Sequence, residues 1–180
     1  MKFIDICLLM KRIYLIRHGQ STANVDNRVY FKTFDHRIPL TELGHSQAQA
    51  VGVELAKKLE GRKVDVIISP YRRTQQTWRE IKKSINSKQI SSFEENPNLR
   101  EQEHKIFTDE MEASLKKAEQ EKFGLFWYRF KNAESIADVY QRVGGVINHL
   151  RLRSMNQELN EDVVIVAHEI TIRCIMMILQ

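Results

Sequence analysis

Residues 12–19 read RIYLIRHG, a short apolar run that leads directly into Arg17, His18 and Gly19. Two later runs have the same character: VDVIIS at 64–69 and DVVIVA at 162–167. All three are rich in Ile and Val and lack the polar alternation of a strand with one wet face. They therefore predict strands of a parallel sheet that is covered on both faces.

Helical patterns separate or follow these strands. After Thr41, a candidate N-cap, apolar residues recur on one helical face until Gly61, which stands where a C-cap glycine is expected. Further helices are expected at about 72–85, 133–152 and 170–179, and a strongly charged, exposed one at about 110–122. Strands that alternate with helices predict an α/β fold, here a three-layer α/β/α sandwich with a mostly parallel central sheet.

The composition is that of one globular domain spanning residues 1–180. Apolar residues make up 42% of the 180, and 28 Lys and Arg against 23 Asp and Glu give a net charge of +5. The basic residues are mixed with acids along the chain, with no arginine-rich arm and no basic and aromatic sheet pattern. We therefore expect no nucleic-acid partner, although a modest positive charge favours encounter with anions.

The cysteines and the chain ends bear on the compartment. Cys7 and Cys174 each lie in an apolar run and match neither a disulfide framework nor a zinc site, so both are expected to be buried thiols. Residues 1–9 make a poor signal peptide and are a candidate for a disordered or misassigned start. No segment predicts membrane association, and we expect a cytoplasmic protein.

The last helix stops at Gln180 without a capping signal, which predicts a truncated or minimal C-terminus.

The three predicted strands deliver basic side chains to one edge of the sheet. Arg17 and His18 follow the first strand, Arg72 and Arg73 follow the second, and His168 follows the third. Ligands of α/β sheets bind outside the carboxyl ends of the strands. Arginine forks bind phosphate oxygens, and a neutral imidazole is a competent nucleophile, so phosphoryl transfer through His18 is the chemistry indicated.

Such a reaction also needs a proton donor for the leaving oxygen. Glu101 and Glu103 are the candidates, because a carboxyl group near a bound phosphate has its pKa raised by like charge. Each residue taken alone has a plainer explanation as a surface or helix residue, and only their joint placement at strand ends favours a site. Neither a metal ion nor a cofactor is expected, since Arg17 places a fixed cation beside His18 and the histidines lack metal-site spacing.

At this point the chain resembles the histidine phosphatase, or phosphoglycerate mutase-like, superfamily. The resemblance rests on IYLIRHGQSTAN at 13–24, DHRIPLTELG at 35–44, SPYRRTQQT at 69–77, LREQ at 99–102 and VAHEITIR at 166–173. These motifs occur in order over nearly the whole chain. The stretch YRFKNAESIADVYQRV at 128–143 is most similar to a branch of short phosphoglycerate-mutase-like proteins of plants, fungi and bacteria.

The resemblance implies roles for individual residues. His18 matches the nucleophile, Glu101 the general acid and base, and His168 the second histidine that holds the transferring phosphoryl group. The residues that match phosphate-binding positions are Arg17, Ser21, Asn24 and Arg73. Arg72 falls on a variable position. The implied reaction is metal-independent hydrolysis of a small phosphorylated substrate in two steps.

Glu169 departs from the family pattern, because glycine usually follows the second histidine. Its side chain adds negative charge at the phosphate-binding position, and it motivates an alternative in which the protein only binds a phosphorylated ligand or protein. Mutase activity is a further alternative, which the short chain disfavours because a mutase normally needs additional segments over its site. Substrate choice is assigned to the loops 25–37 and 93–131, and neither substrate nor oligomeric state can be derived from the sequence.

Overall fold

The predicted strands belong to one five-stranded sheet. The computed structural model describes residues 5–8, 11–103, 110–156, 158 and 162–180. The sheet order is β1-β2-β5-β3-β4. The strands are β1 Asp5–Leu8, β2 Lys11–Arg17, β3 Val64–Ile68, β4 Ile90–Glu95 and β5 Asp162–Ala167. All but β1 run parallel, and β1 pairs antiparallel with β2. The predicted mostly parallel sheet is therefore confirmed.

Apart from the short helix α1, which was not predicted, the helices follow the predicted segments closely. They are α1 Thr22–Val25, α2 Glu42–Leu59, α3 Arg72–Ile81, α4 Glu110–Phe123, α5 Ile136–Met155 and α6 Glu169–Leu179. The Thr41 hydroxyl accepts the Gly44 N–H at 3.1 Å, as expected of an N-cap. The helix predicted from residue 133 begins later, because Ser135 and Asp138 form a capping box that fixes its start.

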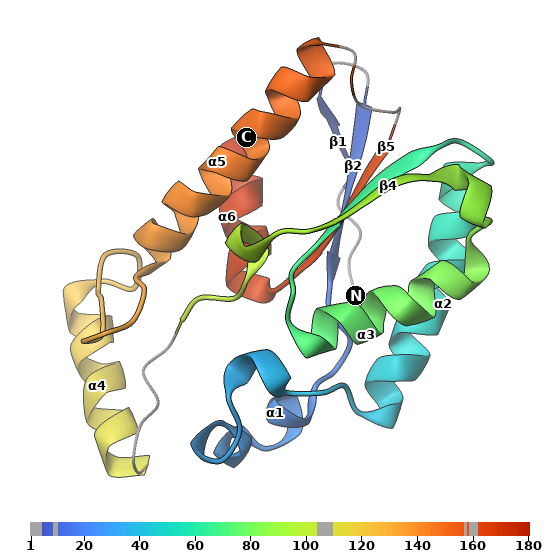
Figure 1. Cartoon of the computed structure of the whole chain (residues 1–180). Coiled ribbons are helices and arrows are strands. Elements are labelled where there is room, and N and C mark those ends of the chain that lie inside the picture. Colours follow the sequence, from blue (N-terminus) through green and yellow to red (C-terminus); the bar gives the residue numbers. More distant parts are fainter. Residues whose placement is uncertain (1–4, 9–10, 104–109, 157, 159–161) are drawn as a thin grey trace.

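Two pairs of helices enclose the sheet and make three layers. Figure 1 shows α2 and α3 on one face and α5 and α6 on the other. Successive side chains of β2 serve the two cores in turn: Ile13 and Leu15 pack with α5 and α6, whereas Tyr14 and Ile16 pack with α2 and α3. Because both faces are buried, the central strands are apolar at most positions, which is why their runs stand out in the sequence.

The two edge strands were not predicted. Asp5–Leu8 form β1, whereas the sequence of residues 1–9 indicates a candidate disordered or misassigned start. β4 is polar and exposed along most of its length, so its strand state follows from hydrogen bonding to β3 rather than from its own pattern. Cys174 is a free, buried thiol as expected. The side chain of Cys7 lies outside the part of the chain that is described.

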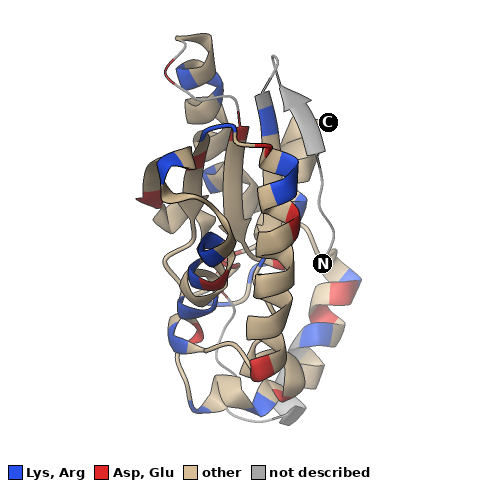
Figure 2. Cartoon of the chain, turned by 90° about the vertical axis from the view of Figure 1, so that its right-hand side faces the viewer, with Lys and Arg blue, Asp and Glu red and all other residues tan. Residues whose placement is uncertain are grey.

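Charged side chains are mixed over the surface. Figure 2 shows Lys and Arg interspersed with Asp and Glu along the helices and loops, while the sheet interior is almost free of both. Within the described ranges, no helix has both the length and the apolar character needed to cross a membrane.

A close backbone contact joins the turn after β2 to the start of α2. A Cβ on Gly44 would lie 2.1 Å from the Gln20 carbonyl oxygen, and one on Gly19 would lie 2.3 Å from the Gly44 carbonyl oxygen. Neither position has space for a side chain. This contact sets the path of the chain immediately after His18.

We predict that Gly44→Ala lowers the free energy of unfolding by about 1–3 kcal/mol, because the added methyl group must displace backbone. Gly145→Ala is the matched control, since Gly145 lies in α5 with no atom near the position of a Cβ. That change should leave stability unchanged or raise it by up to about 1 kcal/mol. Urea denaturation of both variants measures the difference, and equal stabilities would contradict the contact.

Candidate active site

His18 lies at the carboxyl end of β2 and is almost fully buried, with 8% of its surface exposed. Its Nδ1 lies 2.7 Å from the Gly19 carbonyl oxygen, which is an acceptor only, so Nδ1 carries the proton and Nε2 keeps its lone pair. Burial, together with Arg73 and Arg17, lowers the pKa of His18 from 6.5 to about 3. The imidazole is therefore neutral at neutral pH, the state that a nucleophile requires.

His168 packs directly against His18 at the end of β5. The two ring centroids are 5.3 Å apart, and His168 is fully buried. Its Nε2 lies 2.8 Å from the Ser69 hydroxyl at the end of β3. Its Nδ1 is buried and has no hydrogen-bond partner within the described residues. A buried polar atom without a partner calls for an explanation, and a bound ligand would provide one.

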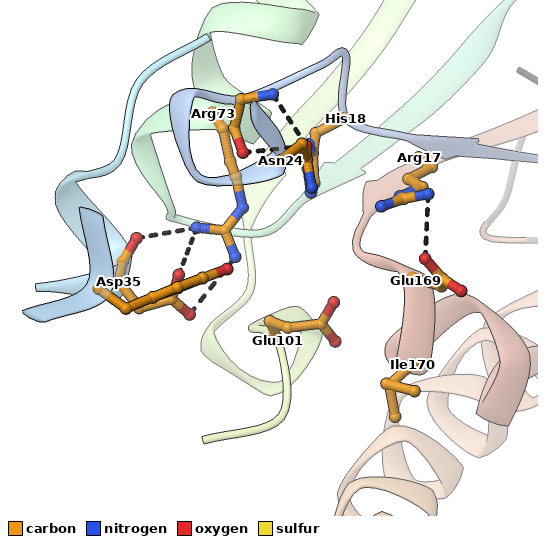
Figure 3. Close-up of a pocket in the computed structure, with 10 residues that line it drawn as sticks. Arg17, His18, Asn24, Asp35, Arg73, Glu101, Glu169 and Ile170 are labelled. Carbon is orange, nitrogen blue, oxygen red and sulfur yellow. Dashed lines mark hydrogen bonds and ion pairs between the residues drawn. The ribbon is translucent and has the colours of Figure 1, made fainter. Parts of the chain in front are cut away.

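Arg73 reaches the site from the first turn of α3. Its guanidinium donates to the Asp35 backbone carbonyl at 2.8 Å and to the Asp35 carboxylate at 2.7 Å (Figure 3). The guanidinium carbon also lies 5.0 Å from the centre of the Tyr71 ring. Arg73 is 2% exposed, so Asp35 provides the counter-charge that allows its burial. Arg72, its neighbour, is exposed and outside the pocket, as the sequence predicted.

Arg17 and Glu169 form an ion pair at the pocket. Arg17 Nη1 lies 3.0 Å from a Glu169 carboxylate oxygen (Figure 3). The other Glu169 oxygen lies 2.6 Å from Arg173, one turn further along α6. Glu169 therefore bridges two guanidinium groups, and its position in the first turn of α6 also suits a negative charge.

Glu101 lies across the pocket from His18 (Figure 3). Burial raises the pKa of its carboxyl group, an effect that the Gln102 N–H and Arg73 partly offset. Arg142 of α5 donates to the backbone carbonyls of Glu101 and Asn98, at 3.1 and 2.5 Å. The Thr171 hydroxyl of α6 donates to the Arg100 carbonyl at 2.7 Å. Two helices thus hold the segment that carries Glu101.

Hydrogen bonds also hold the segment that follows His18. The Gly19 N–H donates to the Thr77 hydroxyl at 3.0 Å, and the Gln20 N–H to the Gln47 side chain at 2.9 Å. Ser21 and Asn24 form a capping box at the N-terminus of the short helix α1. The motif residues around His18 thereby place two polar side chains on the pocket wall.

These side chains enclose a single pocket of about 220 Å³. It includes seven of the predicted site residues: Arg17, His18, Ser21, Asn24, Arg73, Glu101 and Glu169. His168 is not in the lining, and its ring packs against that of His18. Tyr30, Asp35 and Ile170 complete the lining and were not predicted individually, although Tyr30 and Asp35 belong to the loop 25–37 assigned to substrate choice.

The arrangement combines a neutral imidazole, two guanidinium groups and a carboxyl group with a raised pKa around a volume suited to a small anion. Perturbed pKa values gathered in one pocket are typical of a catalytic site. Across the described part of the chain, no three His, Cys, Asp or Glu side chains are grouped so as to hold a metal ion.

Comparison with known proteins shows the family to which the chain belongs. The profile of the histidine phosphatase superfamily (branch 1) matches residues 13–180, and the chain belongs to this family. Phosphoglycerate mutase-like protein AT74H of Arabidopsis thaliana is 38% identical over 92% of the chain. Phosphoserine phosphatase 1 of Hydrogenobacter thermophilus is 30% identical over 91% of the chain and 74% of its own length.

Solved structures share the fold. The alpha-ribazole phosphatase of Shigella flexneri superimposes with a TM-score of 0.65 at 25% identity, over 87% of this chain and 73% of its own. A phosphoglycerate mutase of Bacillus anthracis gives a TM-score of 0.69 at 22% identity, over 91% of this chain and 77% of its own. The chain spans 64% of AT74H and 58% of a second Arabidopsis relative, AT74, to which it is 38% identical over 96% of its length.

The buried neutral state of His18 predicts a pH-dependent stability. Between pH 6.5 and about 3 the unfolded histidine takes up a proton that the folded one does not, so stability falls as pH falls through this window. We expect His18→Asn to reduce the slope of unfolding free energy against pH by up to about 1.4 kcal/mol per pH unit. The exposed His149 of α5 gives the control His149→Asn. Urea denaturation from pH 4.5 to 7.5 tests this, and a slope unchanged in His18→Asn would contradict a neutral His18.

Proposed function

We propose that the protein hydrolyses a phosphate monoester through a phosphohistidine intermediate on His18. The observation that carries this proposal is the neutral His18, whose Nδ1–H donates to the Gly19 carbonyl and leaves Nε2 free to attack. His18 lies beside two arginines in a pocket of about 220 Å³. The family relationship supports phosphoryl transfer, and phosphatases occur among its relatives. We further propose a cytoplasmic enzyme, for which the free thiol of Cys174 is the support.

In the first step His18 Nε2 attacks phosphorus as the bond to the leaving oxygen breaks. Arg17 and Arg73 neutralise the equatorial oxygens, which requires them to turn from their carboxylate partners toward the phosphate. In this proposal the Nδ1 of His168, which is buried beside His18 and has no partner among the described residues, helps to hold the same group in the tautomer that carries a proton there. Glu101, whose pKa is raised by burial, donates a proton to the leaving oxygen in this step.

In the second step a water molecule attacks the phosphohistidine. Glu101, now ionised, accepts the proton of that water, and the bond between Nε2 and phosphorus breaks. Phosphate leaves, and His18 regains its lone pair. Because the arginines supply the positive charge, the proposed reaction needs no metal ion.

The test is hydrolysis of p-nitrophenyl phosphate in the presence of EDTA. We expect turnover by the natural protein, loss of at least 1,000-fold in His18→Ala, and acid-labile radioactivity on His18 after quenching with ³²P-labelled substrate. Arg73→Lys should lose at least tenfold, because lysine lacks the bidentate fork. Arg72→Ala is the matched control and should keep its activity. Ester binding without turnover would instead favour a protein that only binds phosphorylated ligands.

The role of Glu101 predicts a dependence on the leaving group. In Glu101→Gln we expect a loss of about 100-fold or more in kcat with an alkyl phosphate, whose leaving oxygen needs a proton. The rate of phosphoenzyme formation from p-nitrophenyl phosphate should fall much less in this variant, because p-nitrophenolate leaves without protonation. Rapid-quench measurement with both substrates separates the two, and equal losses would assign Glu101 to binding.

A further inference from the structure

The charges that line the pocket are balanced before any ligand enters. Arg17 and Arg73 contribute two positive charges, and Glu169 and Asp35 contribute two negative charges, each in contact with one of the arginines. Burial raises the pKa of the Glu101 carboxyl group, which favours its uncharged form. The phosphate group of a substrate therefore brings negative charge into a pocket whose two arginines already have carboxylate partners.

The lining also contains no third lysine or arginine among the residues described. A substrate with a carboxylate or a second phosphate beside its reacting phosphate would meet Glu169 with no additional cation in the pocket wall. A substrate with an ammonium group would instead find carboxylates on the wall. Like charges within one small pocket repel each other, because solvent screens them only in part there.

Glu169 has a second ion pair besides the one with Arg17. Its second ion pair, with Arg173 at 2.6 Å, does not involve the pocket arginines. When Arg17 turns to the phosphate, the Glu169 carboxylate keeps this anchor and becomes available to a cation on the substrate. Tyr30 adds an aromatic ring to the same lining, and aromatic rings attract cations through their faces.

We propose that Glu169 is a specificity-determining residue. It selects phosphate monoesters whose leaving group carries an ammonium group and rejects those whose leaving group carries a carboxylate or a second phosphate. The inference rests on the proposed phosphatase function and deepens it by naming a substrate class. It also gives a chemical purpose to the residue that departs from the glycine of the family pattern.

The test compares two small esters of similar length, phosphoethanolamine and phosphoglycolate, with p-nitrophenyl phosphate as the reference. We expect kcat/KM of the natural protein to favour phosphoethanolamine over phosphoglycolate by at least tenfold. Glu169→Gln, which removes the charge at nearly constant shape, should reduce this ratio at least tenfold. Glu169→Asp should keep most of the preference. Glu54→Gln, at an exposed position of α2, is the matched control and should leave the ratio unchanged.

The ratio of the two kcat/KM values separates a charge preference from competition between Glu169 and phosphate for Arg17. Loss of Glu169 also frees Arg17, which raises phosphate affinity for every ester by a common factor that cancels in the ratio. A ratio unchanged in Glu169→Gln would overturn the proposal, as would an equal gain for all three esters. Circular dichroism of each variant confirms that it is folded.

Failure of the phosphatase function itself gives a different result. It would show as no turnover of p-nitrophenyl phosphate by the natural protein. Calorimetric affinities of the two esters for His18→Ala, with and without Glu169→Gln, would then decide the charge preference alone. A preference for phosphoethanolamine that depends on Glu169 supports the inference, and equal affinities overturn it.

Discussion

Two backbone hydrogen bonds at the carboxyl ends of the strands hold the site together. The His18 N–H donates to the Ala167 carbonyl, and the Ser69 N–H to the Val166 carbonyl, both at 3.0 Å. They extend the ladders of β5 with β2 and β3 by one residue beyond the strands. His18, Ser69 and His168 thus leave the sheet at the same level. A slip in either ladder would move their side chains apart, which is why a fully buried, two-sided core is needed beneath them.

Assembly of the site costs free energy, because it removes a guanidinium group and two imidazoles from water. Asp35 and Glu169 offset this cost by pairing with Arg73 and Arg17 in the absence of ligand. Breaking the buried pair would leave the charge of Arg73 unpaired, so Arg73 needs an anion at all times, whereas Arg17 is partly exposed to solvent. The phosphate of a substrate takes over this role, and the carboxylates that it displaces then shape what else fits the pocket.

The general acid segment depends on a second group of charges outside the pocket. Glu134 accepts from Arg142 and Arg100, and Arg142 in turn holds the Glu101 backbone. Helix α5 therefore has two tasks, since its apolar face completes the core and its polar side holds this segment. Helix α6 likewise packs on the sheet while its first turn supplies Glu169 and Ile170 to the pocket.

The sequence by itself determined the central strands, the helices that cover them and the residues that converge on the pocket. Its apolar runs are local, and His18, His168, Arg17 and Arg73 follow them directly. Tertiary structure alone decided the edge strands β1 and β4, whose short or polar sequences form strands only by pairing with a neighbour. It also decided the partners of the charges: Asp35 with Arg73, Glu169 with Arg17, and Arg142 beneath Glu101. Arg73 with Asp35, and Arg142 with Glu101, join residues about forty positions apart. Glu169 with Arg17 spans most of the chain. Such contacts leave no periodic trace in the sequence, because they depend on which loops the folded sheet brings face to face.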